Sequence, residues 1–162
     1  MNKKITILFC LITVVVFGQK TDIISLGKTT IEELKLSSYS KDPSAAAVIL
    51  EEQGNVKSII NGPHDFVKNY YVRIKIFNNS ALGLATIKIP YYKMDQVKNI
   101  KAITYNLVDG KMQKKVLTEK EIFKEDFSKD VRVRSFAIPN VKEGSVIEYR
   151  YTLKTNARWT YD

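Results

Sequence analysis

Apolar and polar side chains alternate along much of the chain, a period-two pattern typical of half-buried β-strands. Between residues 70 and 78, Val72 and Ile74 fall on one face while Arg73 and Lys75 fall on the other. Segments of this kind, bounded by turn residues, predict strands at 45–53, 56–61, 70–78, 84–89, 100–108, 111–117, 131–138 and 145–153. The strand content therefore dominates the chain.

Turn residues separate these segments. Gly54-Asn55 predicts a hairpin that joins the first two strands, and Asp109-Gly110 predicts another between 100–108 and 111–117. Pro90 is expected to end the strand 84–89, since proline has no N–H to donate to a sheet.

One short helix is predicted near the N-terminus, because Thr30 and Glu33 have the spacing of a capping box. Lys41-Asp42-Pro43 follows closely, and 118–121 is expected to form a single helical turn. No helix of crossover length separates the strands, so we predict an all-β fold, an antiparallel two-sheet β-sandwich with one short N-terminal helix, after a signal peptide.

The first 18 residues have the layout of a secretory signal: Lys3 and Lys4, an apolar run to Phe17, then Gly18. The apolar run is too short for a membrane span of about 20 residues, and a lipid-modified Cys10 is the less favoured alternative. We expect residues 1–18 to be removed, 19–29 to be an exposed lead, 30–157 to be the β-sandwich domain and 158–162 to begin a truncated interdomain linker. The product is expected to be exported, periplasmic or extracellular, with no membrane span.

The residue inventory argues against catalysis. The 162 residues contain one Cys and one His, and Cys10 lies in the expected signal, so the trimmed chain has no Cys/His pair. We interpret His64 as a surface-loop residue and expect Glu51 and Glu52 to point to opposite faces of their strand, which disfavours a glycosidase. The acidic set Glu119, Glu121, Glu125 and Asp126 lacks the spacing of a calcium loop. We therefore predict no catalytic, metal or cofactor residues.

Charge and aromatic content favour a contact role instead. The chain has 26 Lys and Arg against 17 Asp and Glu, a formal net charge of +9. Arg132 and Arg134 share a strand face with Phe136, and export makes a nucleic-acid partner improbable. Tyr91 and Tyr92 follow Pro90 and are the first candidates for a contact surface with the two arginines. Tyr149 and Tyr151 are expected in the core.

A family resemblance rests on segments spread over most of the chain. They are residues 42–50, 73–77, 87–91, 103–106 with 109–111 and, most specifically, 136–149, with the sequence FAIPNVKEGSVIEY. In this order they resemble the uncharacterised N-terminal domain that precedes transglutaminase-like domains in exported bacterial proteins of the Bacteroidetes type. The resemblance implies a β-sandwich followed by a separate domain whose Cys, His and Asp perform acyl transfer or peptide cleavage.

These observations lead to three hypotheses. The first is a non-catalytic exported module that docks against, or presents substrate to, a transglutaminase-like domain. The second is a stand-alone module that binds a cell-envelope polymer or a peptide through Tyr91, Tyr92, Arg132 and Arg134. The third and least favoured is a carboxylate-based hydrolase.

Overall fold

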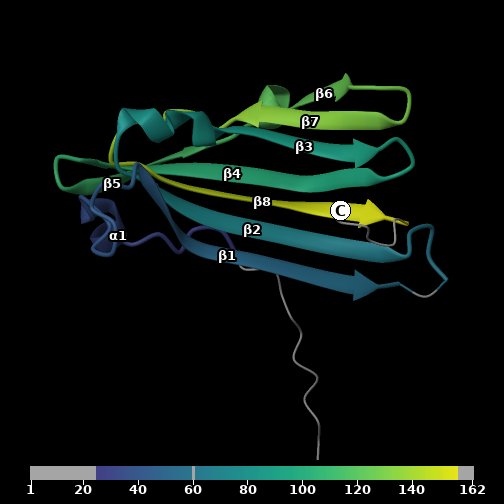
Figure 1. Cartoon of the computed structure of the whole chain (residues 1–162), viewed down its shortest axis with the longest axis horizontal. Coiled ribbons are helices and arrows are strands. Elements are labelled where there is room, and N and C mark those ends of the chain that lie inside the picture. Colours follow the sequence, from purple (N-terminus) through teal and green to yellow (C-terminus); the bar gives the residue numbers. More distant parts are fainter. Residues whose placement is uncertain (1–24, 60, 157–162) are drawn as a thin grey trace, which may run out of the picture.

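The computed structural model describes residues 25–59 and 61–156, so the expected signal at 1–18 and linker at 158–162 lie outside the described residues. The strands form two antiparallel sheets (Figure 1). The five-stranded sheet has the order β1 (Ala47–Ser58), β2 (Phe66–Ile76), β8 (Val146–Thr155), β4 (Gln96–Val108) and β5 (Lys111–Val116). The three-stranded sheet has the order β3 (Thr86–Tyr92), β7 (Val131–Ala137) and β6 (Phe123–Asp126). The predicted all-β sandwich is confirmed.

Short helical elements have the positions that their capping residues predict. Helix α1 spans Ile31–Lys35, and its capping box pairs Thr30 with Glu33 in both directions. Two 3-10 helices follow, η1 (Asn79–Ala85) and η2 (Glu119–Glu121), the second at the expected helical turn. The predicted hairpin at Asp109-Gly110 is also confirmed, and both residues have positive φ, 50° and 73°.

The main core lies between the inner faces of the two sheets. Apolar side chains alternate toward it from β2 and β8, as the sequence pattern predicts. The buried members of this core are Val72, Ile74, Ile76, Ala81, Ala85, Ile89, Tyr91, Val97, Ala102, Leu117, Phe136, Ile138 and Ile147. Tyr149 and Tyr151 pack against this core while remaining partly exposed.

The predicted hairpin at Gly54-Asn55 is wrong, because β1 continues through both residues to Ser58. Gly54 pairs with Tyr70 and Asn55 with Asn69, so β2 supplies a partner along the whole length of β1. Neither residue is among those with positive φ. The cross-strand pairing therefore outweighs the local turn preference.

The expected strand end at Pro90 is also wrong, since β3 runs through it to Tyr92. Pro90 pairs with Val133 of β7, and β3 has no neighbour on its other side within the described sheet. An edge strand tolerates proline because one side of its backbone needs no donor. The four-residue strand β6 was not predicted, because its sequence FKED has no clear alternation.

Both faces of β2 are buried near its end, whereas the alternation predicted one solvated face. Arg73 and Lys75 are buried on the outer face of the five-stranded sheet, where both contact α1. Thr29, expected in an exposed lead, is buried too, because its hydroxyl lies against Glu148 on the same face. A small second core forms here from Leu34, Tyr105 and Val146.

Glu148 is the centre of this outer face and is 0% exposed. Its carboxylate accepts hydrogen bonds from the Gly27 N–H at 2.8 Å and the Thr29 hydroxyl at 2.7 Å. It also accepts one from the Tyr105 hydroxyl at 3.2 Å and lies 3.9 Å from the guanidinium of Arg73. Because a buried carboxylate is costly without partners, this set is what holds the N-terminal segment against the sheet.

Arg73 and Lys75 extend this outer-face network to α1. Arg73 forms ion pairs with Glu33 at 3.0 Å and with Glu51 at 3.1 Å. The Lys75 ammonium donates to the carbonyl of Leu34 at 2.7 Å and to that of Gly144 at 2.6 Å. Burial lowers the pKa of Lys75, while the carbonyl at the end of α1 provides a partner for its charge.

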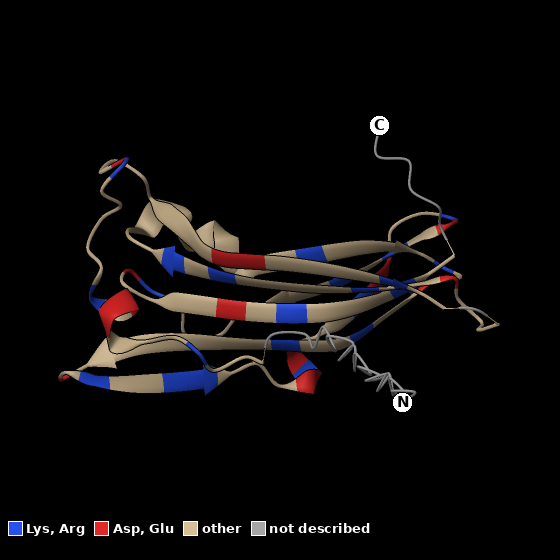
Figure 2. Cartoon of the chain, turned by 90° about the horizontal axis from the view of Figure 1, so that it is seen from below, with Lys and Arg blue, Asp and Glu red and all other residues tan. Residues whose placement is uncertain are grey.

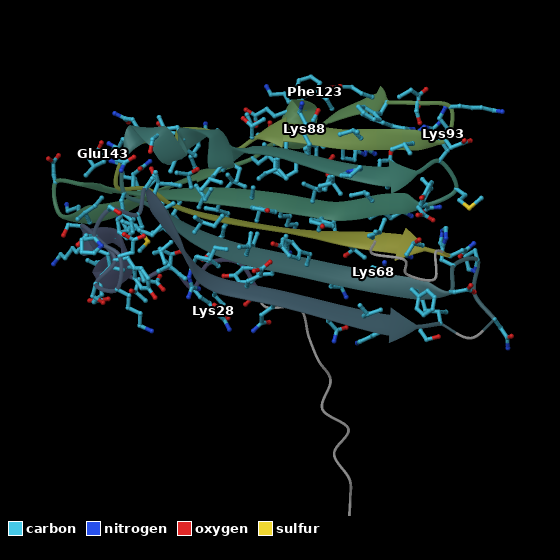
Figure 3. The ribbon with its side chains drawn as sticks, viewed as in Figure 1. Lys28, Lys68, Lys88, Lys93, Phe123 and Glu143 are labelled. Carbon is cyan, nitrogen blue, oxygen red and sulfur yellow. The ribbon has the colours of Figure 1, made fainter. Side chains whose placement is uncertain are left out.

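We expect Glu148→Ala to lower the free energy of unfolding by about 3–5 kcal/mol, because it leaves Arg73 and three donors without their shared acceptor. Urea unfolding measures this loss. The exposed Glu143, labelled in Figure 3, is the control, and Glu143→Ala is expected to change stability by less than about 0.5 kcal/mol. Equal effects of the two substitutions would refute the role of Glu148.

The free energy of unfolding at alkaline pH tests the same outer face of the five-stranded sheet. Burial, followed by the charge of Glu148, raises the pKa of Tyr71 from 10.0 to about 12. The folded state therefore keeps a proton that the unfolded chain loses, so this contribution to stability is complete below pH 10 and disappears between pH 10 and 12. Urea unfolding at these pH values should show a steeper loss for the unmodified chain than for Tyr71→Phe. Parallel curves would contradict this assignment.

Candidate functional site

The inner face of β7 changes from apolar to cationic along the strand. Phe136 is buried in the core, and the next residues on that face are Arg134 and Arg132. Their cross-strand partners on β3 are Ile89 for Arg134 and Tyr91 for Arg132. The sequence prediction that both arginines share a face with Phe136 is confirmed. Charge at this position prevents the two sheets from closing into a dry core at this end.

A cleft occupies this end, between the first half of β4 and strands β6 and β7. It consists of two hollows of about 480 and 330 Å³, which share Val97, Lys98 and Arg134 in their walls. We call this the basic cleft. Its walls contain Tyr91, Lys93, Met94, Asp95, Gln96, Val97, Lys98, Asn99, Ile100, Lys101, Glu119, Ile122, Lys124, Arg132 and Arg134. Lys93 lies at the turn that follows β3 (Figure 3).

Cations outnumber carboxylates in these walls, six to two. Arg132 is already engaged, since its Nε donates to Asp126 at 2.9 Å, and Lys93 lies 3.8 Å from the same carboxylate. The hydrogen bond from Arg132 is the main reason that the pKa of Asp126 is lowered. These contacts compensate only part of the positive charge.

Arg134 differs from Arg132 in lacking such a contact. Its Nε atom is buried and has no hydrogen-bond partner among the described residues. A buried guanidinium nitrogen without an acceptor lowers stability, because its hydration is lost and nothing replaces it. Arg134 therefore has an unfilled capacity to bind an oxygen atom that carries negative charge.

The geometry of β4 contributes to the cleft through a β-bulge. Lys98 pairs with Thr152 and Lys101 pairs with Arg150, so two residues of β4 oppose one of β8. Asn99 lies in the bulge with a φ of 54° and donates to the Thr152 hydroxyl at 3.3 Å. Bulges redirect side chains locally, and Lys98 and Lys101, on either side of this one, line the cleft.

The four residues predicted as a contact surface do not form one surface. Tyr91, Arg132 and Arg134 line the basic cleft, although Tyr91 is buried in the core and is not the free side chain expected beyond a strand end. Tyr92 is 54% exposed and, as the next residue of β3, faces the opposite way. Its position outside the cleft follows from the continuation of β3 through Pro90.

Sequence reasoning missed four cations of the cleft: Lys93, Lys98, Lys101 and Lys124. A signal for the first three is present, since they occur close together in the sequence KMDQVKNIK. Lys124 had no such signal, because it belongs to the unpredicted strand β6.

The other candidate residues have structural environments. His64 is buried, which corrects the expected surface position, and neither ring nitrogen has a partner among the described residues. Glu51 and Glu52 lie on opposite faces as predicted: Glu51 contacts Arg73, and Glu52 accepts from the Tyr70 hydroxyl at 2.6 Å. Within residues 25–59 and 61–156, no group of three or more His, Cys, Asp or Glu residues is placed to hold a metal ion.

The described helices are all too short or too polar to cross a membrane.

Comparisons with known proteins show a family and a solved structure to which this chain is similar. A family model described as a domain of unknown function with a solved structure, DUF3857, matches residues 63–160. A search of the curated proteins finds no match. A crystal structure described as that of a "putative protease" from Parabacteroides distasonis is similar, with a TM-score of 0.57 and 12% identity over 72% of this chain. This chain spans 24% of the length of that protein, and the likeness concerns the fold.

We expect Arg134→Met to leave the free energy of unfolding unchanged or to raise it by about 1 kcal/mol, because it removes a buried nitrogen that has no acceptor. Urea unfolding measures the change, with Arg73→Met as the comparison, since Arg73 has two close carboxylates and should lose several kcal/mol. A loss for Arg134→Met as large as that for Arg73→Met would assign Arg134 a purely structural role.

Proposed function

The chain belongs to the DUF3857 family, and from this premise we propose that it is a non-catalytic module that binds an acidic protein surface in its basic cleft. The observation that carries the proposal is the unpartnered Nε of Arg134 in walls where cations outnumber carboxylates six to two. The partner that the sequence resemblance implies is a transglutaminase-like domain, which this module would dock against or supply with substrate.

The form of the cleft favours an extended acidic segment. The two hollows share a wall, so cations are spread along one continuous surface instead of converging on a single point. Val97, Ile100 and Ile122 add apolar patches between them, suited to the methylene groups of Asp and Glu side chains. An exported location, which the N-terminal signal predicts, is part of this proposal.

Absence of catalysis is also part of the proposal and has its own test. The full chain should show no amine incorporation and no peptide hydrolysis when supplied with glutamine-containing peptides. Turnover above that of a heat-denatured sample would overturn it.

We expect the full chain to bind a fluorescently labelled oligoglutamate peptide at low ionic strength, and Arg134→Gln to weaken this binding about tenfold, the effect of losing about 1.4 kcal/mol of contact energy. Fluorescence anisotropy measures both. Added salt should weaken binding further, because the cleft is open to solvent.

Lys88→Gln is the matched control, since Lys88 is an exposed cation of β3 that does not line the cleft (Figure 3). Equal weakening by both substitutions would show that net charge alone attracts the peptide. Binding of lipopolysaccharide but not of oligoglutamate would favour the alternative, a module for cell-envelope polymers.

A further inference from the structure

The two sheets have four edge strands, and three of them carry features that block further strand pairing. β5 has Lys111, Lys114 and Lys115 among its six residues, β3 contains Pro90, and β6 has only four residues. Lysines, proline and short length are the means by which sheet edges avoid adding strands. Figure 2 shows where Lys and Arg and where Asp and Glu lie along the strands, seen from below.

The remaining edge, β1, has the least protection. It is 12 residues long, contains no proline, and has no neighbour on its outer side within the described part of the chain. From Glu52 to Ser58 every residue is exposed except Asn55, which is partly buried. Ile49 and Val56 are 55% and 51% exposed. In the described part of the chain, the protective features of this edge are limited to a bulge near Ile49 and a single lysine, Lys57.

Gly54, in the middle of this exposed stretch, has no local reason to be glycine. Its φ is not positive, and an added Cβ would meet nothing within 4 Å. A glycine in a strand interior otherwise weakens the strand, and it is favoured where another backbone approaches closely. The residue is therefore suited to a backbone neighbour, which residues 25–59 and 61–156 do not supply.

We propose that β1 pairs in an antiparallel manner with β1 of a second copy of this chain, with the two-fold axis at Gly54. This register follows from charge: it places Glu51 opposite Lys57 of the second copy, twice across the axis. Both residues lie on the outer face, since they pair with Arg73 and Val67, which alternate onto the same side of β2. Opposite charges on directly opposed residues stabilise a strand pair. The two five-stranded sheets then form one continuous sheet.

The test uses the full chain in a Cys10→Ser background, in which Gly54→Cys creates one thiol per chain. Residues opposed at the two-fold axis have Cα atoms about 4.5–5.5 Å apart, within the range of a disulfide. Mild oxidation should therefore give a covalent dimer. The control is Gly83→Cys, which lies outside β1 at a position where a Cβ also meets nothing within 4 Å.

Light scattering on the unmodified chain provides a second readout, independent of the thiol. We expect a mass of twice 18.6 kDa that falls on dilution. Lys57→Glu should weaken the dimer about tenfold or more by opposing two carboxylates, whereas Lys111→Glu at the other edge of the sheet should not. A monomeric mass at every concentration, or equal cross-linking of the two cysteine variants, would overturn the proposal.

Discussion

The buried carboxylate of Glu148 is the interaction on which the rest of the structure depends. It lies on the outer face of a central strand, where water would otherwise solvate the sheet, and it gathers donors from Gly27, Thr29 and Tyr105. Those bonds require the N-terminal segment to lie across the sheet, and that segment in turn buries Arg73 and Lys75. One sheet thus has a core on each face, although only the inner core is mainly apolar.

The cations of the outer face and those of the basic cleft have different surroundings. The terminal nitrogens of Arg73 and Lys75 contact carboxylates and carbonyls inside the fold, although the Nε of Arg73, like that of Arg134, has no partner among the described residues. Arg134 lies at the open end of the other core, with a buried nitrogen that lacks an acceptor. Such a group lowers stability at its position, and the basic cleft around it is the surface to which we propose that a partner of this DUF3857 domain binds.

The sequence allowed the fold class and most strands to be predicted, because alternation and capping are local signals. The prediction was wrong where strand pairing decides the local structure. Gly54-Asn55 has the residues of a turn, but pairing with β2 keeps both residues in a strand. Pro90 was expected to end a strand, but its position at a sheet edge allows the strand to continue. The second error misplaced Tyr91, which is buried. At the candidate site, Arg132 and Arg134 were found by alternation, but Lys124 was not, because the three-dimensional meeting of β6 with β4 leaves no local pattern.

The most direct test of the central claim is a map of backbone amide chemical shifts during titration with oligoglutamate. The account predicts that the largest changes fall in 91–101 and 122–134, the segments that form the basic cleft, with little change in the lysine-rich β5. Changes of similar size at every exposed lysine, or changes centred on β5, would contradict it.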